Sequence, residues 1–140
     1  MNSTCKMFSP TRCFHLIHLN REEYVILKFQ FSQFMAYYHV HGLIPDTLAQ
    51  SEGYQLFEQY IANGAPKDNF DGFELISRVH APQTGEVFVT CKAENHLKVA
   101  EHFAIWRAKF GVEWDVKPVF NDEEVIKRNK QVAEEIAAMG

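Results

Sequence analysis

The segment from Gly72 to Glu94 limits the fold more than any other, because it predicts a β-hairpin. Two runs of β-branched and aromatic residues flank Pro82-Gln83-Thr84-Gly85, a sequence typical of a turn. On the first strand, alternation assigns one face to Phe73, Leu75, Ser77 and Val79 and the other to Glu74, Ile76, Arg78 and His80. On the second, Val87, Val89 and Cys91 alternate with Glu86, Phe88, Thr90 and Lys92.

The two faces of this hairpin differ little in polarity. Ile76 and Phe88 put apolar groups on the face that would be polar if only one side of the sheet were covered. We therefore expect both faces to be partly buried, which requires a covering layer on each.

The rest of the chain predicts strands and helices that can pair with the hairpin or cover it. Periodicity and capping residues indicate a strand over 34–42, a helix from Asp46 or Thr47 to Asn63, a helix from Asn95 to Phe110, a strand over 112–120 and a helix over 121–138. Gly53 offers an alternative start for the first helix, because glycine inside a helix costs about 1 kcal/mol relative to alanine. Pro118 cannot donate to a sheet ladder, so the last strand is expected at an edge.

Each predicted helix carries an expected apolar face. In the first, the face is Gly53, Leu56, Phe57, Tyr60 and Ile61. In the second it is Leu97, Ala100, Phe103, Ala104 and Arg107, which leaves Trp106 beside the stripe and His96 and His102 on a solvated side. In the last it is Val125, Val132, Ala133 and Ile136.

The first 33 residues form an extension of uncertain order, and the compact domain is expected over 34–140. Met35 is a candidate start, which would make the extension a mis-assigned one. Residues 24–31, YVILKFQF, nevertheless predict a strand that would need a partner if it were exposed.

The order β-α-β-β-α-β, followed by a helix, predicts an α+β fold of the ferredoxin-like type. This fold has a four-stranded antiparallel sheet with two helices on one face. The hairpin would supply its two central strands. Because the other sheet face is left open, we expect two copies to pack through it. The expected assembly is a homodimer in the form of a dimeric α/β barrel.

Composition excludes several classes of partner. A net charge of −4 argues against nucleic acid, and no apolar run approaches the roughly 18 residues that span a membrane. The interrupted N-terminus lacks a secretory leader, so a cytoplasmic protein is expected. Cys5, Cys13 and Cys91 form neither a disulfide framework nor a metal motif, and Cys91 is expected in the core.

The region from Met35 to about Glu135 resembles a bacterial family, the domain of unknown function 3303. The similarity lies in Arg78-Val79-His80, in the Gly85-x-x-Phe88-Val89 strand, in Trp106, and in the ending VKPVFNDEE over 116–124. The resemblance implies membership of the dimeric α/β-barrel superfamily. That superfamily includes cofactor-free monooxygenases, haem enzymes and stress-induced proteins, so the fold does not determine the activity.

Related barrels often have a pocket between sheet and helices, and the resemblance therefore suggests where to look for a site. The expected ligand-binding residues are Tyr37, His39, Tyr60, Arg78, His80 and Trp106. The catalytic candidates are His80 as a general base, Arg78 as an anion or oxyanion partner, and His39. Phe57, Phe103 and Trp114 are expected to be core residues that could also line the pocket.

The histidines of the first predicted strand do not predict a metal site. His39 and His41 share a face with Tyr37, and they would approach Arg78 and His80 if their strands were neighbours. No carboxylate follows at a useful spacing, so neither a metal nor another cofactor is predicted. Two functions remain: a module that binds a small hydrophobic molecule or serves a structural or sensing role, and a cofactor-independent monooxygenase or isomerase that uses His80 and Arg78.

Overall fold

The computed structural model of the protein describes residues 20–23 and 35–140. In the short N-terminal segment, Asn20 and Glu23 each cap the backbone N–H of the other, at 2.8 and 3.0 Å. The strand expected over 24–31 and most of the proposed extension lie outside the described residues.

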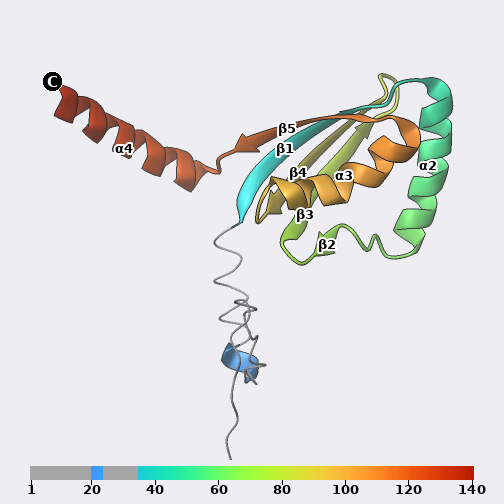
Figure 1. Ribbon diagram of the computed structural model, residues 1–140, viewed down its shortest axis with the longest axis horizontal. Helices are drawn as coiled ribbons and strands as arrows, with labels where there is room; N and C mark the ends of the chain where they lie inside the picture. Colours follow the sequence, from blue (N-terminus) through green and yellow to red (C-terminus); the bar gives the residue numbers. More distant parts are fainter. Residues whose placement is uncertain (1–19, 24–34) are drawn as a thin grey trace, which may run out of the picture.

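The main body is an α+β domain with one antiparallel sheet, as predicted (Figure 1). The strands are β1 (Ala36–Leu43), β2 (Asn69–Phe70), β3 (Phe73–Ala81), β4 (Glu86–Ala93) and β5 (Glu113–Val119). Their order across the sheet is β2-β3-β4-β1-β5. The sheet therefore has five strands and not the four expected, because the two residues of β2 turn back at Gly72 and pair with the start of β3.

The hairpin of β3 and β4 forms as predicted, but it does not supply both central strands. β4 lies between β3 and β1, and β1 in turn lies between β4 and β5. β1 and β3 are therefore not neighbours, and the expectation that His39 and His41 approach Arg78 and His80 is wrong. β5 lies at an edge, as Pro118 predicts.

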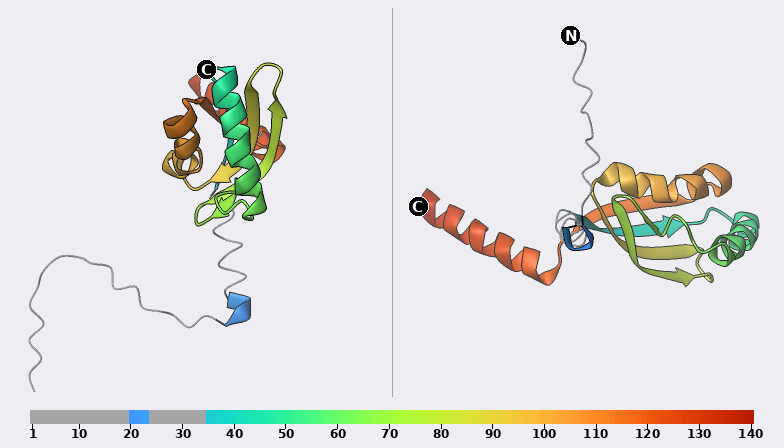
Figure 2. Two further views of the ribbon diagram at one scale, coloured as in Figure 1. Left: turned by 90° about the vertical axis from the view of Figure 1, so that its right-hand side faces the viewer. Right: turned by 90° about the horizontal axis from the view of Figure 1, so that it is seen from below.

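Two helices lie on one side of this sheet, with caps that match the sequence. Helix α2 (Thr47–Ala62) begins at the Asp46 cap, so Gly53 is inside the helix and the alternative start is wrong. Helix α3 (His96–Phe110) begins at the Asn95 cap and ends at Gly111, whose φ of 68° suits glycine. α3 runs along the sheet, while α2 stands beside α3 at the end nearest the β3–β4 turn (Figure 2).

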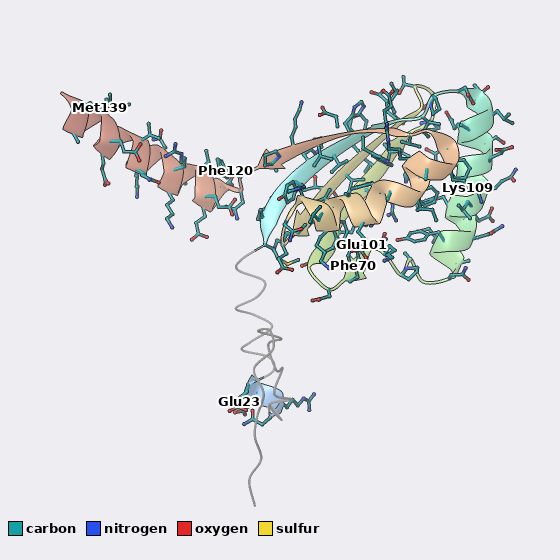
Figure 3. The ribbon with its side chains drawn as sticks, viewed as in Figure 1. Glu23, Phe70, Glu101, Lys109, Phe120 and Met139 are labelled. Atoms are coloured by element: carbon teal, nitrogen blue, oxygen red, sulfur yellow. The ribbon has the colours of Figure 1, made fainter. Side chains whose placement is uncertain are left out.

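Helix α4 (Asp122–Met139) begins with a capping box between Asn121 and Glu124 and extends away from the sheet (Figure 1). None of its residues is buried, and Ile136 of the predicted stripe is 63% exposed. Figure 3 shows its side chains standing clear of the domain between Phe120 and Met139. The stripe is present, but it does not pack on the sheet of its own chain.

A β-bulge in β3 changes which residues face the helices. Leu75 pairs with Cys91 and Ser77 with Thr90, which are neighbours on β4. Ile76 therefore has no partner residue on β4 and is the extra residue of the bulge. Beyond the bulge, Arg78 lies opposite Val89 and His80 opposite Val87, both of which are buried. The predicted alternation is therefore wrong after Leu75: Arg78 and His80 share the helix-covered face with Phe73 and Leu75.

The core fills the space between this face and α3. Its fully or nearly buried members are Val40, Phe73, Val87, Val89, Cys91, Ala93, Val99 and Phe103. Burial raises the pKa of the Cys91 thiol to about 12, so this side chain is an inert core residue, as expected. The buried residues of α3 are Val99, His102, Phe103 and Phe110. The predicted stripe through Leu97 and Arg107 shares only Phe103 with them, so the prediction of the buried face is wrong.

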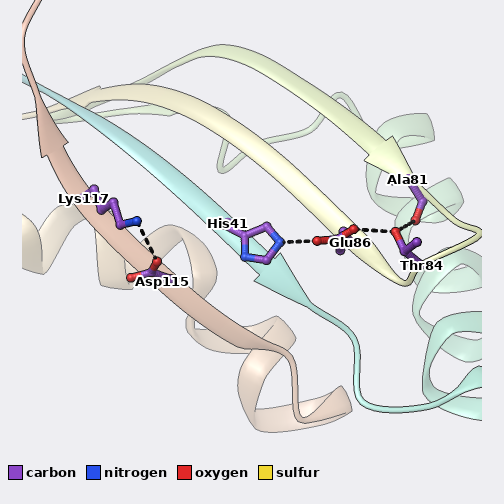
Figure 4. Close-up of polar contacts among 6 residues, drawn as sticks. All are labelled: His41, Ala81, Thr84, Glu86, Asp115 and Lys117. Carbon is purple, nitrogen blue, oxygen red and sulfur yellow. Dashed lines mark hydrogen bonds and ion pairs between the residues drawn. The ribbon is translucent and has the colours of Figure 1, made fainter.

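Neither α2 nor α3 covers the opposite face of the sheet, which carries mixed side chains and is called the open face below, with reference to the described residues alone. His41 Nε2 lies 2.8 Å from Glu86 Oε1, and the Thr84 hydroxyl donates to Glu86 Oε2 at 2.5 Å (Figure 4). These hydrogen bonds, with that of Thr84 the stronger influence, lower the pKa of Glu86. Val79 on the same face is 60% exposed.

Candidate functional site

A cavity lies between α2, α3 and the helix-covered face of the sheet. The unfilled space measures about 560 Å³, including the part that opens to solvent. Most of the wall is aromatic or aliphatic, and its polar groups belong to Tyr54, Arg78, His80, His102 and the indoles of Trp106 and Trp114.

Arg78 is held in place by a buried, two-pronged ion pair with Asp68. Its Nη1 and Nη2 donate to the two carboxylate oxygens of Asp68 at 2.9 and 3.0 Å. The guanidinium also lies over the ring of Phe57, 4.7 Å from the centroid. Both charged side chains are mostly buried, at 14% and 13% exposed, and the pairing offsets part of the cost of desolvating them.

Asp68 receives a third hydrogen bond, from the Tyr60 hydroxyl at 2.7 Å. Burial alone would raise the pKa of Asp68, but the hydrogen bonds from Arg78 and Tyr60 and the charge of Arg78 outweigh it and lower that pKa. The same surroundings raise the pKa of Tyr60, chiefly through burial. Asp68 is therefore ionised and Tyr60 neutral at physiological pH.

His80 lies where the cavity meets the surface. Its Nδ1 is 3.2 Å from the Tyr54 hydroxyl, and its ring lies 5.1 Å from that of Phe57. Partial burial, and then the charge of Arg78, lower the pKa of His80. The ring is therefore neutral at physiological pH, and one of its nitrogens can accept a proton.

His102 is the polar residue of this cavity that the sequence analysis misplaced. It was expected on a solvated side of its helix, but it is only 4% exposed. Its Nδ1 contacts the carbonyl oxygen of Lys67 at 2.5 Å, and its ring stacks on Phe73 with centroids 4.6 Å apart. Burial lowers its pKa, so a neutral imidazole fastens the loop before β2 to α3.

Trp114 forms part of the cavity wall from the edge strand. Its indole lies over Gly42 of β1 so closely that a Cβ there would be 2.3 Å from the ring. The indole N–H is buried and has no hydrogen-bond partner among the residues that the structure describes. A buried donor of this kind costs free energy unless an acceptor is supplied.

The residues predicted for one site are divided between the two sides of the sheet. Arg78, His80 and Trp106 line the cavity. Tyr60 stands behind it, with its ring 5.9 Å from that of Trp106 and its hydroxyl on Asp68. Tyr37 and His39 pair with Lys92 and Thr90 on the open face. The expected core residues Phe57, Phe103 and Trp114 all line the cavity.

Three polar contributors, Tyr54, Asp68 and His102, were not predicted, and for His102 the sequence holds a periodic signal. Val99, His102, Phe103, Trp106 and Phe110 follow the i, i+3, i+4 spacing of a helical face, which places both His102 and Trp106 inward. Asp68 lies in a loop after Pro66 and has no periodic pattern around it. Only the folded chain brings it to Arg78.

The described residues contain neither of two features that would indicate another class of function. Over residues 20–23 and 35–140, no three His, Cys, Asp or Glu side chains gather as metal ligands would. Within the same ranges, no helix is both long and apolar enough to cross a membrane.

Comparisons with known proteins support one assignment. The family model described as "Domain of unknown function (DUF3303)" matches residues 32–133. No curated protein is significantly similar to the chain. Among solved structures, Rv0793 from Mycobacterium tuberculosis is similar at 17% sequence identity and a TM-score of 0.43, over 61% of this chain and 96% of that one. Since the family model spans most of the sequence, the chain belongs to the DUF3303 family.

Proposed function

We propose that this protein binds a small hydrophobic molecule in the cavity between α2, α3 and the sheet, and that it does so as a homodimer in the bacterial cytoplasm. The observation that carries the proposal is the composition of the cavity wall. Aromatic and aliphatic side chains surround a few fixed polar groups, Arg78, His80 and Tyr54 among them. Small-molecule sites commonly combine an apolar lining with a few placed polar groups.

A cavity-filling variant tests the proposal. Ala49 lines the cavity, so Ala49→Leu adds volume there, whereas Ala62→Leu adds the same volume at an exposed position on the same helix. We expect wild type and Ala62→Leu to retain a small molecule that native mass spectrometry detects and solvent extraction releases. Ala49→Leu should lose it. Equal retention by both variants would place the molecule elsewhere.

The second candidate function is cofactor-independent oxygenation or isomerisation, and one observation favours it. His80 stands beside the cavity with a lowered pKa, which suits a general base near neutral pH. If the bound compound is converted, His80→Gln should stop the conversion and keep the binding. His39→Gln is the matched control, because His39 pairs with Thr90 on the other side of the sheet. If His80→Gln converts the compound as fast as wild type does, His80 is not the general base.

The proposed dimer uses the open face of the sheet. Phe88 packs against His41 there with ring centroids 5.0 Å apart, and Val79 beside it is largely exposed. A second sheet laid on this face would bury these apolar groups. Sedimentation equilibrium should give a dimer for wild type and for Ala100→Glu, which changes an exposed helix residue. Phe88→Glu should give a monomer.

A further inference from the structure

The positive charge on Arg78 is already neutralised by Asp68. This affects the charge of the ligands that the cavity can bind. Both outer nitrogens of the guanidinium donate to Asp68, and Asp68 is further held by Tyr60. Both partners are mostly buried, so a bound anion would have to compete with a carboxylate that is already bound to Arg78. This argues against Arg78 as the partner of an anionic ligand, the role that the sequence suggests for it.

No other side chain of the cavity wall supplies a charge at neutral pH. His80 and His102 have lowered pKa values and are neutral, and burial raises the pKa of Tyr54. The remaining lining residues are aliphatic or aromatic apart from Gly53. The wall with its supporting carboxylate therefore has no net charge, and six aromatic rings favour a flat ligand: Tyr54, Phe57, Phe103, Trp106, Phe110 and Trp114.

We infer that the cavity selects an uncharged, planar compound over the corresponding carboxylate, and that Asp68 determines this selectivity by occupying Arg78. The inference rests on the proposed function and narrows its ligand class. An anion entering the cavity would lose its hydration without gaining a free cationic partner. A neutral ring loses little hydration and gains aromatic contacts.

Benzamide and benzoate provide a matched pair of probes, since they have the same shape and differ in charge. Each is titrated at pH 7.5 into the full-length protein labelled with nitrogen-15. The indole N–H signals of Trp106 and Trp114 report binding, because both rings line the cavity. We expect the dissociation constant of benzoate to be at least tenfold higher than that of benzamide.

Asp68→Asn tests the cause of the selectivity. The amide keeps the shape of the carboxylate but removes its charge, which leaves Arg78 unmatched, so benzoate should bind at least tenfold more tightly than it does to wild type. Asp68→Asn with Arg78→Gln is the control. This double variant again has an uncharged wall and should prefer benzamide as wild type does. If the single variant does not fold, the comparison of benzamide with benzoate in wild type still tests the selectivity itself.

The outcomes separate the two proposals. If both probes bind wild type equally, the cavity binds ligands but the inference on charge is wrong. If benzoate gains nothing in Asp68→Asn, or gains as much in the double variant, Asp68 does not determine the selectivity. If neither probe shifts the indole signals, the proposed small-molecule site fails, and the ligand class inferred for it fails too.

Discussion

The two faces of the sheet are built from alternate residues of the same strands, yet they differ in almost every physical respect. The helix-covered face carries Val40, Val89 and Cys91, which are buried, and places Arg78 in a closed ion pair. The open face carries His41, Glu86 and Thr84 in a chain of partly exposed hydrogen bonds. The covered face therefore holds Arg78 in a mostly buried ion pair, whereas the open face leaves the pair of His41 and Glu86 about one third exposed.

The largest expected effect comes from exchanging phenylalanine for alanine on each face. Phe73 is 2% exposed, so Phe73→Ala should lower the free energy of unfolding by about 3–5 kcal/mol through lost burial and the cavity left behind. Phe88→Ala on the open face should cost about 1 kcal/mol in the monomer, since this ring is only half buried. Urea denaturation measures both.

The same two variants also test the proposed dimer when their stability is measured at several protein concentrations. If two copies join through the open face, the cost of Phe88→Ala should rise with protein concentration while that of Phe73→Ala stays constant. A cost for Phe88→Ala that does not change over a hundredfold range of concentration would contradict the proposed interface.

Close packing of Trp114 on Gly42 provides the next test. Gly42→Ala puts a methyl group where the indole ring lies, so either the ring or the strand must move, at a cost of about 1–3 kcal/mol. Ser77→Ala changes an exposed position on the open face and should cost less than about 0.5 kcal/mol. Thermal unfolding followed by circular dichroism distinguishes them. A Gly42→Ala protein as stable as wild type would show that the indole has room to shift.

A smaller effect is expected from acid. The folded-state pKa of His102 is lowered by burial, whereas the unfolded chain protonates this residue near pH 6.5. The unfolded state therefore binds more protons as pH falls through about 6.5, and the free energy of unfolding decreases until the folded state also protonates. His80 contributes in the same direction, but less, because it is more exposed.

His102→Gln isolates this contribution, since an amide can still donate to the Lys67 carbonyl without titrating. Denaturant midpoints measured between pH 7.5 and 5 should fall less steeply in the variant than in wild type. Parallel curves for the two proteins would mean that His102 is not the group responsible.

The smallest effect is expected from helix α4. None of its residues is buried, so removing residues 122–140 should change the stability of the remaining domain by less than about 0.5 kcal/mol at low protein concentration. Urea midpoints before and after truncation provide the measurement. A larger loss would show that α4 contacts the domain more closely than its exposure indicates.

Local signals in the sequence predicted most of the elements, because each is specified by neighbours along the chain. Asp46, Asn95 and Asn121 cap their helices as expected, and Pro118 lies in an edge strand. The site was harder to predict because it depends on contacts between distant residues. Asp68 contacts Arg78 because the loop before β2 folds back, and no spacing of residues in the sequence predicts that contact.

The predicted faces were wrong in two places. Strict alternation did not hold in β3, which contains a bulge, and helical spacing allowed two different apolar stripes in α3. In α3, Leu97 and Ala104 form one such stripe, but Val99, Phe103 and Phe110 bury more apolar surface, so the helix turns that side inward. In β1, alternation is regular throughout, and it correctly keeps Tyr37 and His39 on the same face as His41.

The bulge at Ile76 means that β3 contains one residue more than its side-chain alternation requires. Omitting that residue leaves Phe73-Glu-Leu-Ser-Arg-Val-His80, in which strict alternation by itself puts Phe73, Leu75, Arg78 and His80 on one side. A shortened relative without the bulge could therefore keep the same cavity wall, whereas one more inserted residue would turn Arg78 away from Asp68. The cavity wall therefore tolerates the loss of one residue at this point of β3 but not the gain of one.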